Sequence, residues 1–185
     1  PGLLLRDIRQ RTPDVLAARD AIVAARPDVL LLLDLDYDLD GLALAAFADL
    51  LTAAGLALPH RIALRPNTGM ATGLDMDGDG RFGTLDDAQG WGRFAGAGGM
   101  ALLSRLPIRA DTLIDHSALL WRDLPDARLP RVDGALFPSD AVVAEQRLSS
   151  TNHWEVAIDT PSGLLHLMAW HAGPPAFGGP HGRNR

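Results

Sequence analysis

The spacing of hydrophobic residues in the first third of the chain predicts a helix, a buried strand and a second helix. Thr12 and Pro13 supply an N-cap and a first-turn proline, and apolar residues then recur at helical spacing up to the next proline. The run DVLLLL at residues 28–33 is short, apolar and bounded by proline and charge, which is typical of a buried strand. Residues 40–54 predict a second helix that Gly55 closes.

Strand patterns return in the second half of the chain. Residues 98–108, GGMALLSRLPI, predict a buried strand that ends near a proline. Residues 109–146 are rich in Asp, Arg and Pro, so we predict mostly loop with one or two short strands. Residues 153–170 contain HWEVAID and LLHLMAW on either side of TPSG, which predicts a hairpin whose second strand leads directly into His171.

The composition fits one domain with a hydrophobic core, because 185 residues with 47% apolar content are enough to bury one. Seventeen basic residues stand against 23 acidic ones, so the charge does not indicate a nucleic-acid partner, although a local contact stays open. Cysteine is absent, which leaves oxygen and imidazole as metal ligands. No apolar run reaches the roughly 18 residues of a membrane span.

Residues 74–90, LDMDGDGRFGTLDDAQG, gather carboxylates among glycines. Asp75, Asp77 and Asp79 follow the D-x-D-x-D-G opening of an EF-hand-type calcium loop, with Gly80 at the sharp turn. Like charges repel one another and glycines lose much entropy on ordering, so a bound cation would stabilise this segment. The alternative is a solvated run of Asp-Gly turns.

The remaining ligand positions of this loop fall on Arg81 and Asp86. The carbonyl of Arg81 stands where a backbone ligand is expected, and Asp86 takes the twelfth position in place of the usual glutamate. Because Asp is one methylene shorter, Asp86, or Asp87 beside it, would bind with one oxygen or through water. Ca²⁺ suits the loop better than Mg²⁺, since it accepts more ligands in flexible geometry, and this favours a secreted or periplasmic location over the cytosol.

A buried strand ending in Asp34, the strand GGMALLSRLPI and the strand LHLMAWHAGPP together resemble the endonuclease/exonuclease/phosphatase superfamily, the deoxyribonuclease I-like metal-dependent phosphoesterases. The segment PNTGMATGLDMDGDG is similar to an insertion found in a bacterial subgroup. The resemblance implies an α+β fold, a four-layer α/β/β/α sandwich that is incomplete in this chain. Residues 1–185 would form one partial domain, with the calcium loop inserted at about residues 66–98.

The resemblance also implies a metal-dependent phosphoester hydrolase, whether phosphodiesterase, nuclease or phosphatase. Asp34 stands where the family has the glutamate that holds a catalytic divalent ion, usually Mg²⁺. His171 matches the first of two active-site histidines, which contacts the scissile phosphate and can protonate the leaving oxygen. Asn67 is a weaker candidate for a polar contact in the same cleft. The family mechanism is an in-line attack of water on phosphorus.

Several family motifs are not found in this sequence: a metal-binding Asn on an N-terminal strand, a Gly-Asp-x-Asn segment and a closing Asp-His pair. We therefore expect this chain alone to be a weak catalyst or inactive and to be a piece of a longer protein. A complementary chain or segment that supplies the missing motifs is one partner that the resemblance allows. The alternative function is an inactive, calcium-stabilised binding or scaffold domain, in which His171 is an ordinary hydrogen-bonded histidine and Asp34 merely ends a strand.

Overall fold

The computed structural model describes residues 2–172. The helices are α1 (Leu3–Gln10), α2 (Pro13–Ala25), α3 (Leu42–Ala53) and α4 (Asp140–Glu145), with short 3₁₀ turns η1 (Leu85–Asp87) and η2 (Trp121–Asp123). The strands are β1 (Val29–Leu35), β2 (His60–Ala63), β3 (Gly99–Ser104), β4 (Ile108–Asp115), β5 (Arg131–Val132), β6 (Ala135–Leu136), β7 (His153–Thr160) and β8 (Gly163–Trp170).

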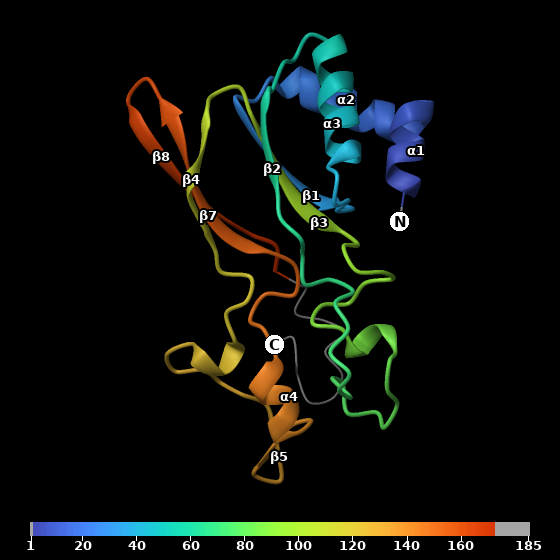
Figure 1. Ribbon diagram of the computed structural model, residues 1–185, viewed down its shortest axis with the longest axis vertical. Helices are drawn as coiled ribbons and strands as arrows, with labels where there is room; N and C mark the ends of the chain where they lie inside the picture. The colour runs from blue at the N-terminus through green and yellow to red at the C-terminus, as the bar shows by residue number, and fades with distance from the viewer. Residues whose placement is uncertain (1, 173–185) are drawn as a thin grey trace.

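The larger strands form two antiparallel sheets. In the first sheet β3 lies between β1 and β2, and in the second β7 lies between β4 and β8. Strands β5 and β6 make a separate small ribbon. Figure 1 shows helices α1 to α3 beside the first sheet, with the second sheet on its other side. The structure, with its antiparallel sheets, is compatible with the α+β class that the family resemblance implied.

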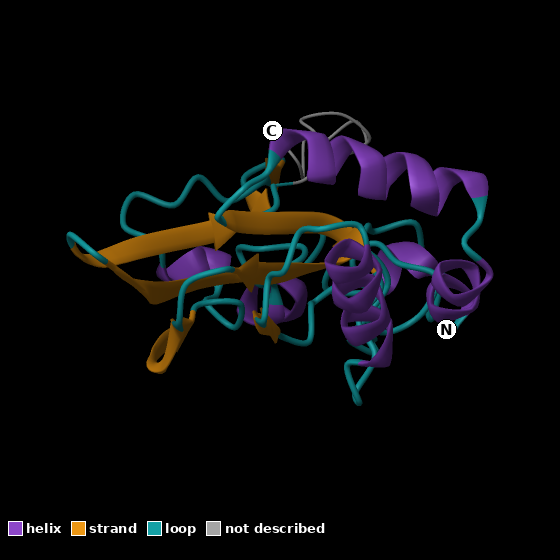
Figure 2. Ribbon diagram, turned by 90° about the horizontal axis from the view of Figure 1, so that it is seen from above, coloured by secondary structure: helices purple, strands orange, loops and turns teal. Residues whose placement is uncertain are grey.

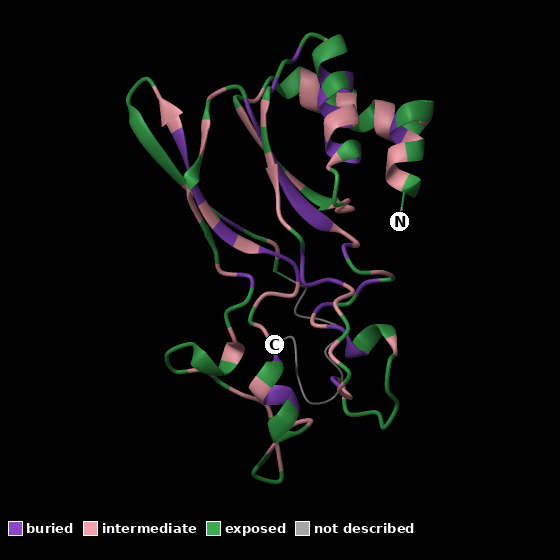
Figure 3. Cartoon of the chain, in the orientation of Figure 1, coloured by how far each residue is buried: buried purple, intermediate pink, exposed green. Residues whose placement is uncertain are grey.

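Strand β3 separates two hydrophobic cores, and all six of its residues are buried. Ala101 and Leu103 face the core beneath the helices, together with Leu51 and other apolar residues of α3. Met100 and Leu102 face the second core, which they share with inward-facing residues of β7 and β8. Burial on both faces explains the unbroken apolar run in this strand. Figure 2 shows the strands and the helices from above, and β3 is buried along its whole length (Figure 3).

The strongest sequence patterns were the most reliable guides to secondary structure. The predicted helices at residues 12–26 and 40–54, the strand after residue 28 and the hairpin at 153–170 are confirmed. Helices α1 and α4 and strand β2 were not predicted. Residues 109–146, expected to be mostly loop with one or two short strands, contain most of the eight-residue β4 as well as the two-residue β5 and β6. Strand β4 mixes polar with apolar residues, and its pairing with β7 rather than local propensity orders it.

Two long loop segments pack against each other beyond one end of the sheets (Figure 1). They cover about residues 66–98 and 117–150. Gly90 of the first segment lies so close to the second that an added Cβ would be 1.9 Å from the Ser150 carbonyl oxygen. Gln89 also donates a hydrogen bond to the Glu145 carbonyl at 2.7 Å. None of the helices in residues 2–172 combines the length and apolar character that a membrane crossing requires.

Candidate active site and acidic loop

Asp34 leaves the β-ladder at the end of β1. The register with β3 shifts between Leu32 and Leu35, and Asp34 itself adopts a left-handed backbone with φ 57°. Such a bulge turns one side chain away from the regular alternation of the strand. The Asp34 side chain is 81% exposed as a result. Its carboxylate accepts no hydrogen bond from residues 2–172, so it stays available to a ligand.

His171 lies next to Asp34, although it follows β8 in the other sheet. Its Nδ1 atom is 4.0 Å from Oδ1 of Asp34, and its side chain is 29% exposed. Nδ1 is itself buried and has no hydrogen-bond partner within residues 2–172. The structure thus brings together the carboxylate and the imidazole that the resemblance selected from opposite ends of the chain.

The acidic residues after Asp34 hold the end of β1 in place. Oδ1 of Asp36 accepts a hydrogen bond from the Gly98 amide at 3.0 Å. Oδ2 of Asp38 accepts one from the Ala43 amide, also at 3.0 Å, in the first turn of α3. These two carboxylates therefore order the chain between β1 and α3, where the orphan amides of a helix start need acceptors.

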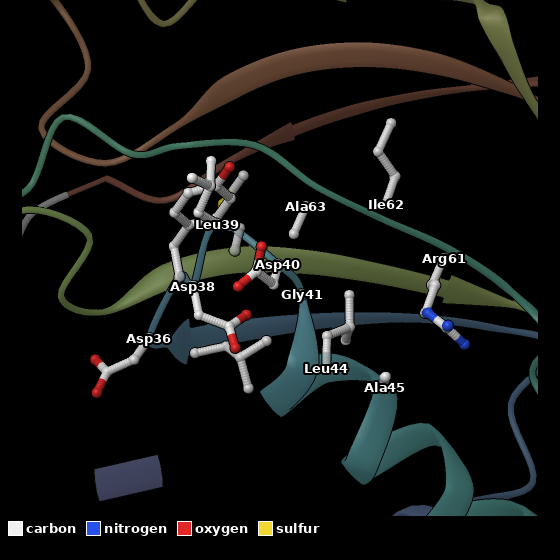
Figure 4. A pocket seen from close by; sticks show the side chains of 13 residues that line it. Asp36, Asp38, Leu39, Asp40, Gly41, Leu44, Ala45, Arg61, Ile62 and Ala63 are labelled. Carbon is white, nitrogen blue, oxygen red and sulfur yellow. The ribbon is translucent and has the colours of Figure 1, made fainter. Parts of the chain in front are cut away.

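A pocket of about 260 Å³ opens beside this acidic turn. Asp36, Asp38 and Asp40 line one end of the pocket, while Arg61 of strand β2 lies at the other end (Figure 4). Apolar side chains, including Leu44, form its floor. The lining of the pocket begins at Leu35, and Asp34 itself is not among its residues.

Asn67 lies in a buried network between the two long loops. The side chain is fully buried, and its Nδ2 donates hydrogen bonds to the carbonyls of Ser117 at 2.7 Å and Ser149 at 2.6 Å. Its Oδ1 accepts a hydrogen bond from Nη1 of Arg147 at 2.6 Å. The backbone amide of Asn67 also donates to the Thr151 carbonyl at 2.8 Å. With these contacts Asn67 joins the loops, and its polar atoms are engaged by the protein itself.

The acidic loop turns around the carboxylate of Asp75. Oδ1 of this residue accepts hydrogen bonds from the amides of Gly78 and Asp79, and Oδ2 accepts one from Gly80. Oδ1 of Asp77 accepts a bond from the Asp79 amide at 3.3 Å. The D-x-D-x-D-G pattern therefore forms a compact turn in which the backbone amides point at the carboxylates.

A third carboxylate reaches this turn from Asp87. One oxygen from each of Asp75, Asp77 and Asp87 lies within 4.8 Å of the other two, a spacing that suits a metal ion. Asp87 is 2% exposed, and it accepts hydrogen bonds from the amide of Met76 at 2.8 Å and the amide of Thr84 at 2.9 Å. Thr84 and Asp87 form a capping box across η1, which helps to fix the position of the Asp87 carboxylate.

The pKa values of Asp77 and Asp87 are shifted in opposite directions. Burial raises the pKa of Asp77, and the neighbouring carboxylates of Asp79 and Asp75 add to this effect. Burial also acts to raise the pKa of Asp87, but hydrogen bonds from Met76 and Thr84 outweigh it and lower the pKa. A cation among these groups would therefore relieve repulsion felt mainly at Asp77.

The other predicted loop ligands lie outside this group of three. Oδ1 of Asp79 accepts a hydrogen bond from the Arg81 amide at 2.7 Å, and the Arg81 guanidinium lies 3.9 Å from the same carboxylate. Asp86 precedes Asp87 within η1. The structure thus brings two of the candidate ligands, Asp75 and Asp77, close to Asp87, which the sequence offered as the alternative to Asp86.

A comparison with models of protein families identifies the family of this chain. A model of the Endonuclease/Exonuclease/phosphatase family matches residues 3–181. The chain belongs to this family. No curated protein and no solved structure matches the chain. Family membership indicates a hydrolase of the metal-dependent phosphoesterase type in general, and such proteins generally use divalent metal ions.

Proposed function

We propose that Asp34 and His171 form part of the active cleft of a metal-dependent phosphoester hydrolase, which acts as a phosphodiesterase, nuclease or phosphatase. The observation that supports this function is the 4.0 Å separation of Nδ1 of His171 and Oδ1 of Asp34 at the ends of strands in two different sheets. A carboxylate and an imidazole side by side are suited to holding a cation and moving a proton on one phosphate.

The Asp34 carboxylate fits Mg²⁺ as the catalytic ion. Mg²⁺ is usually held by one or two carboxylates, keeps several waters and completes its shell with substrate phosphate oxygens. Asp34 is exposed and accepts no hydrogen bond from residues 2–172, so it meets this requirement with one carboxylate. When bound, the ion neutralises negative charge that develops on the phosphate oxygens during in-line attack by water.

His171 would supply the proton in this reaction. Its ring is partly exposed at the strand end, and its Nδ1 atom lies 4.0 Å from Oδ1 of Asp34. A charged imidazole can donate a hydrogen bond to the phosphate and then transfer its proton to the leaving oxygen. Asn67 would act indirectly, without touching the substrate, because it holds the loop that follows Arg65 against Ser117 and Ser149.

We also propose that the described elements are three layers of the four-layer α/β/β/α sandwich typical of deoxyribonuclease I-like proteins. The helices α1 to α3, the sheet of β1 to β3 and the sheet of β4, β7 and β8 follow one another in that order, with a core at each boundary. On this interpretation residues 1–185 are one partial domain, and residues 66–98 are the insertion that carries the acidic loop.

The acidic loop is proposed as a structural Ca²⁺ site. The three gathered carboxylates of Asp75, Asp77 and Asp87 support this proposal, as does the raised pKa of Asp77, which burial and then the neighbouring carboxylates cause. Oxygen ligands from carboxylates and backbone carbonyls suit Ca²⁺, which tolerates a flexible shell. An ion here would fix the insertion against the loop near Phe137, whose ring packs close to Gly78.

Hydrolysis of a chromogenic phosphodiester in the presence of Mg²⁺ tests the proposed activity. His171→Ala should lower the rate on the order of 100-fold, the usual contribution of a general acid. His166→Ala is the matched control, because His166 lies on β8, which leads into His171, but faces outward and pairs with Glu155 at 2.9 Å. Equal rates in the two variants would contradict a catalytic role for His171.

One alternative remains, a calcium-stabilised binding or scaffold domain without catalysis. It is supported by the small number of reactive groups at the cleft, where residues 2–172 contribute one exposed carboxylate at Asp34 and one imidazole at His171. A chain that binds Ca²⁺ in calorimetric titration but shows no Mg²⁺-dependent hydrolysis, also when the flanking coding sequence is included, would favour this alternative.

A further inference from the structure

Three buried side-chain atoms lack a hydrogen-bond partner within residues 2–172, and they come from neighbouring positions. These atoms are Oδ1 of Asn152, Nε1 of Trp154 and Nδ1 of His171. Asn152 and Trp154 are both fully buried. Buried polar groups in native proteins are almost always hydrogen-bonded, to protein or to ordered water, so three exceptions at one place call for a common explanation.

The register of β7 and β8 places these residues side by side. His153 pairs with Trp170, and Trp154 pairs with Ala169, so the same antiparallel register carried one residue further sets Asn152 opposite His171. Trp154 and Ala169 both face the core between the sheets. Because side chains alternate along a strand, Asn152 and His171 belong to that inner face as well.

The chemistry of the three atoms is complementary. The Nδ2 group of Asn152 donates to the Arg65 carbonyl at 3.2 Å, which leaves Oδ1 as the free acceptor of that amide. The indole Nε1 of Trp154 can only donate a hydrogen bond. Nδ1 of His171 can donate or accept according to the tautomer of the ring. One buried water with about three hydrogen bonds, the usual number, would satisfy all of them.

We propose that Asn152 is a positioning residue for His171. Oδ1 of Asn152 accepts a hydrogen bond from a buried water, and that water accepts hydrogen bonds from Nε1 of Trp154 and from Nδ1 of His171. The imidazole is thereby held in the Nδ1–H tautomer, which leaves Nε2 to face the cleft. The proposal rests on the proposed function only for what Nε2 does to a substrate, since the tautomer is a property of the resting protein.

Nitrogen NMR of the full chain tests this arrangement directly. Long-range proton–nitrogen spectra of the neutral His171 ring should show the Nδ1–H tautomer in the unmodified protein. Asn152→Leu, which keeps the side-chain shape, should shift the tautomer ratio toward Nε2–H by about fivefold, the weight of one typical hydrogen bond. Trp154→Phe removes only the indole donor and should shift the ratio in the same direction by less.

Two further variants separate positioning from general destabilisation. Thr151→Val changes a buried neighbour of Asn152 and should leave the His171 tautomer unchanged. Asp34→Asn should shift it by less than Asn152→Leu does, because the 4.0 Å separation from Nδ1 exceeds hydrogen-bond distance and only a charge effect is lost. An Nε2–H tautomer in the unmodified protein would overturn the proposal. So would a tautomer shift in Asp34→Asn that Asn152→Leu does not produce.

The same spectra distinguish this proposal from the proposed function. A tautomer shift in Asn152→Leu, in a protein that does not hydrolyse phosphoesters, would support the positioning of His171 and reject the activity. Hydrolysis that depends on His171 but is insensitive to Asn152→Leu, with an unchanged tautomer, would support the activity and overturn the positioning. Where both hold, Asn152→Leu should lower kcat more than it raises KM, since Asn152 has no contact with substrate.

Discussion

Oδ1 of Asp34 lies 4.0 Å from Nδ1 of His171, and the two residues end strands in different sheets. Each sheet alone presents one reactive group, and only the packing of β1 and β3 against β7 and β8 brings the pair together. The bulge before Leu35 turns the carboxylate out of the ladder toward the imidazole. This relationship is the structural basis of the proposed phosphoester chemistry.

Replacing Asp34 tests whether the exposed carboxylate holds Mg²⁺. Asp34→Asn should change the free energy of unfolding by less than about 0.5 kcal/mol, because the side chain is exposed and away from the core. It should weaken the apparent Mg²⁺ affinity in the hydrolysis assay by about tenfold or more. A Mg²⁺ titration of the rate measures this, with Asp20→Asn, on the exposed surface of α2, as the control.

Asp87 should stabilise the fold without any metal. Its buried carboxylate accepts hydrogen bonds from Met76 and Thr84, so Asp87→Asn in a chelator should cost about 1–3 kcal/mol of unfolding free energy at neutral pH. The native pKa of Asp87 lies below the ordinary value of 3.8, so its contribution is complete above that pH.

The same contribution is lost as the pH falls below 3.8 and through the lowered native pKa of Asp87. The difference in stability between the native protein and Asp87→Asn should therefore shrink in acid. Denaturant unfolding at neutral and acidic pH measures this difference. A gap that stays constant across this range would show that ionisation of Asp87 has no part in it.

Ionisation of Asp77, unlike that of Asp87, should lower the stability of the fold. Burial and the carboxylates of Asp79 and Asp75 raise its native pKa, so ionised Asp77 makes the calcium-free protein less stable above that pKa than below it. Asp77→Asn should leave the chelated protein as stable or slightly more stable, within about 0.5 kcal/mol.

In the same variant the Ca²⁺ affinity should fall by about tenfold or more, because a charged ligand is lost. Thermal unfolding with chelator and with Ca²⁺, together with calorimetric titration, measures both effects of Asp77→Asn. An unchanged affinity would exclude Asp77 from the calcium site. Asp86→Asn serves as a comparison, since Asp86 lies outside the gathered group of three.

Alanine substitutions at two glycines of the insertion distinguish the cost of a strained backbone conformation from the cost of a steric clash. Gly69 and Gly73 have φ angles of 69° and 75°, so alanine is strained to a similar degree at both. An added Cβ at Gly69 would lie 2.0 Å from the Phe94 carbonyl oxygen, whereas at Gly73 it meets nothing within 4 Å.

Gly73→Ala should therefore cost about 1 kcal/mol of stability, the usual penalty of this conformation. Gly69→Ala should cost clearly more, because the backbone of the neighbouring segment must move. Urea unfolding of the two variants under identical conditions measures the difference. Equal costs would mean that the approach of Gly69 to the segment at Phe94 is not maintained in solution.

The sequence determined the elements whose patterns are local and strong. Helix α2 follows from its first-turn proline and apolar spacing, β1 and β3 from short apolar runs, and the β7–β8 hairpin from two strands around a turn. The spacing of Asp75 and Asp77 around glycines also made them candidate ligands, and the structure brings one oxygen of each close to Asp87. The family resemblance placed Asp34 and His171 among the candidates, and the family match agrees with it.

Only the tertiary structure decided which residues meet. It assigned Asp87 to the acidic turn, because η1 folds this residue back onto Met76. It placed Asn67 in a buried network with Arg147, a contact between loops that no local pattern encodes. It also set Asn152 beside His171 through strand register. These pairings depend on how distant segments pack, and packing is a property of the whole chain rather than of any short window of its sequence.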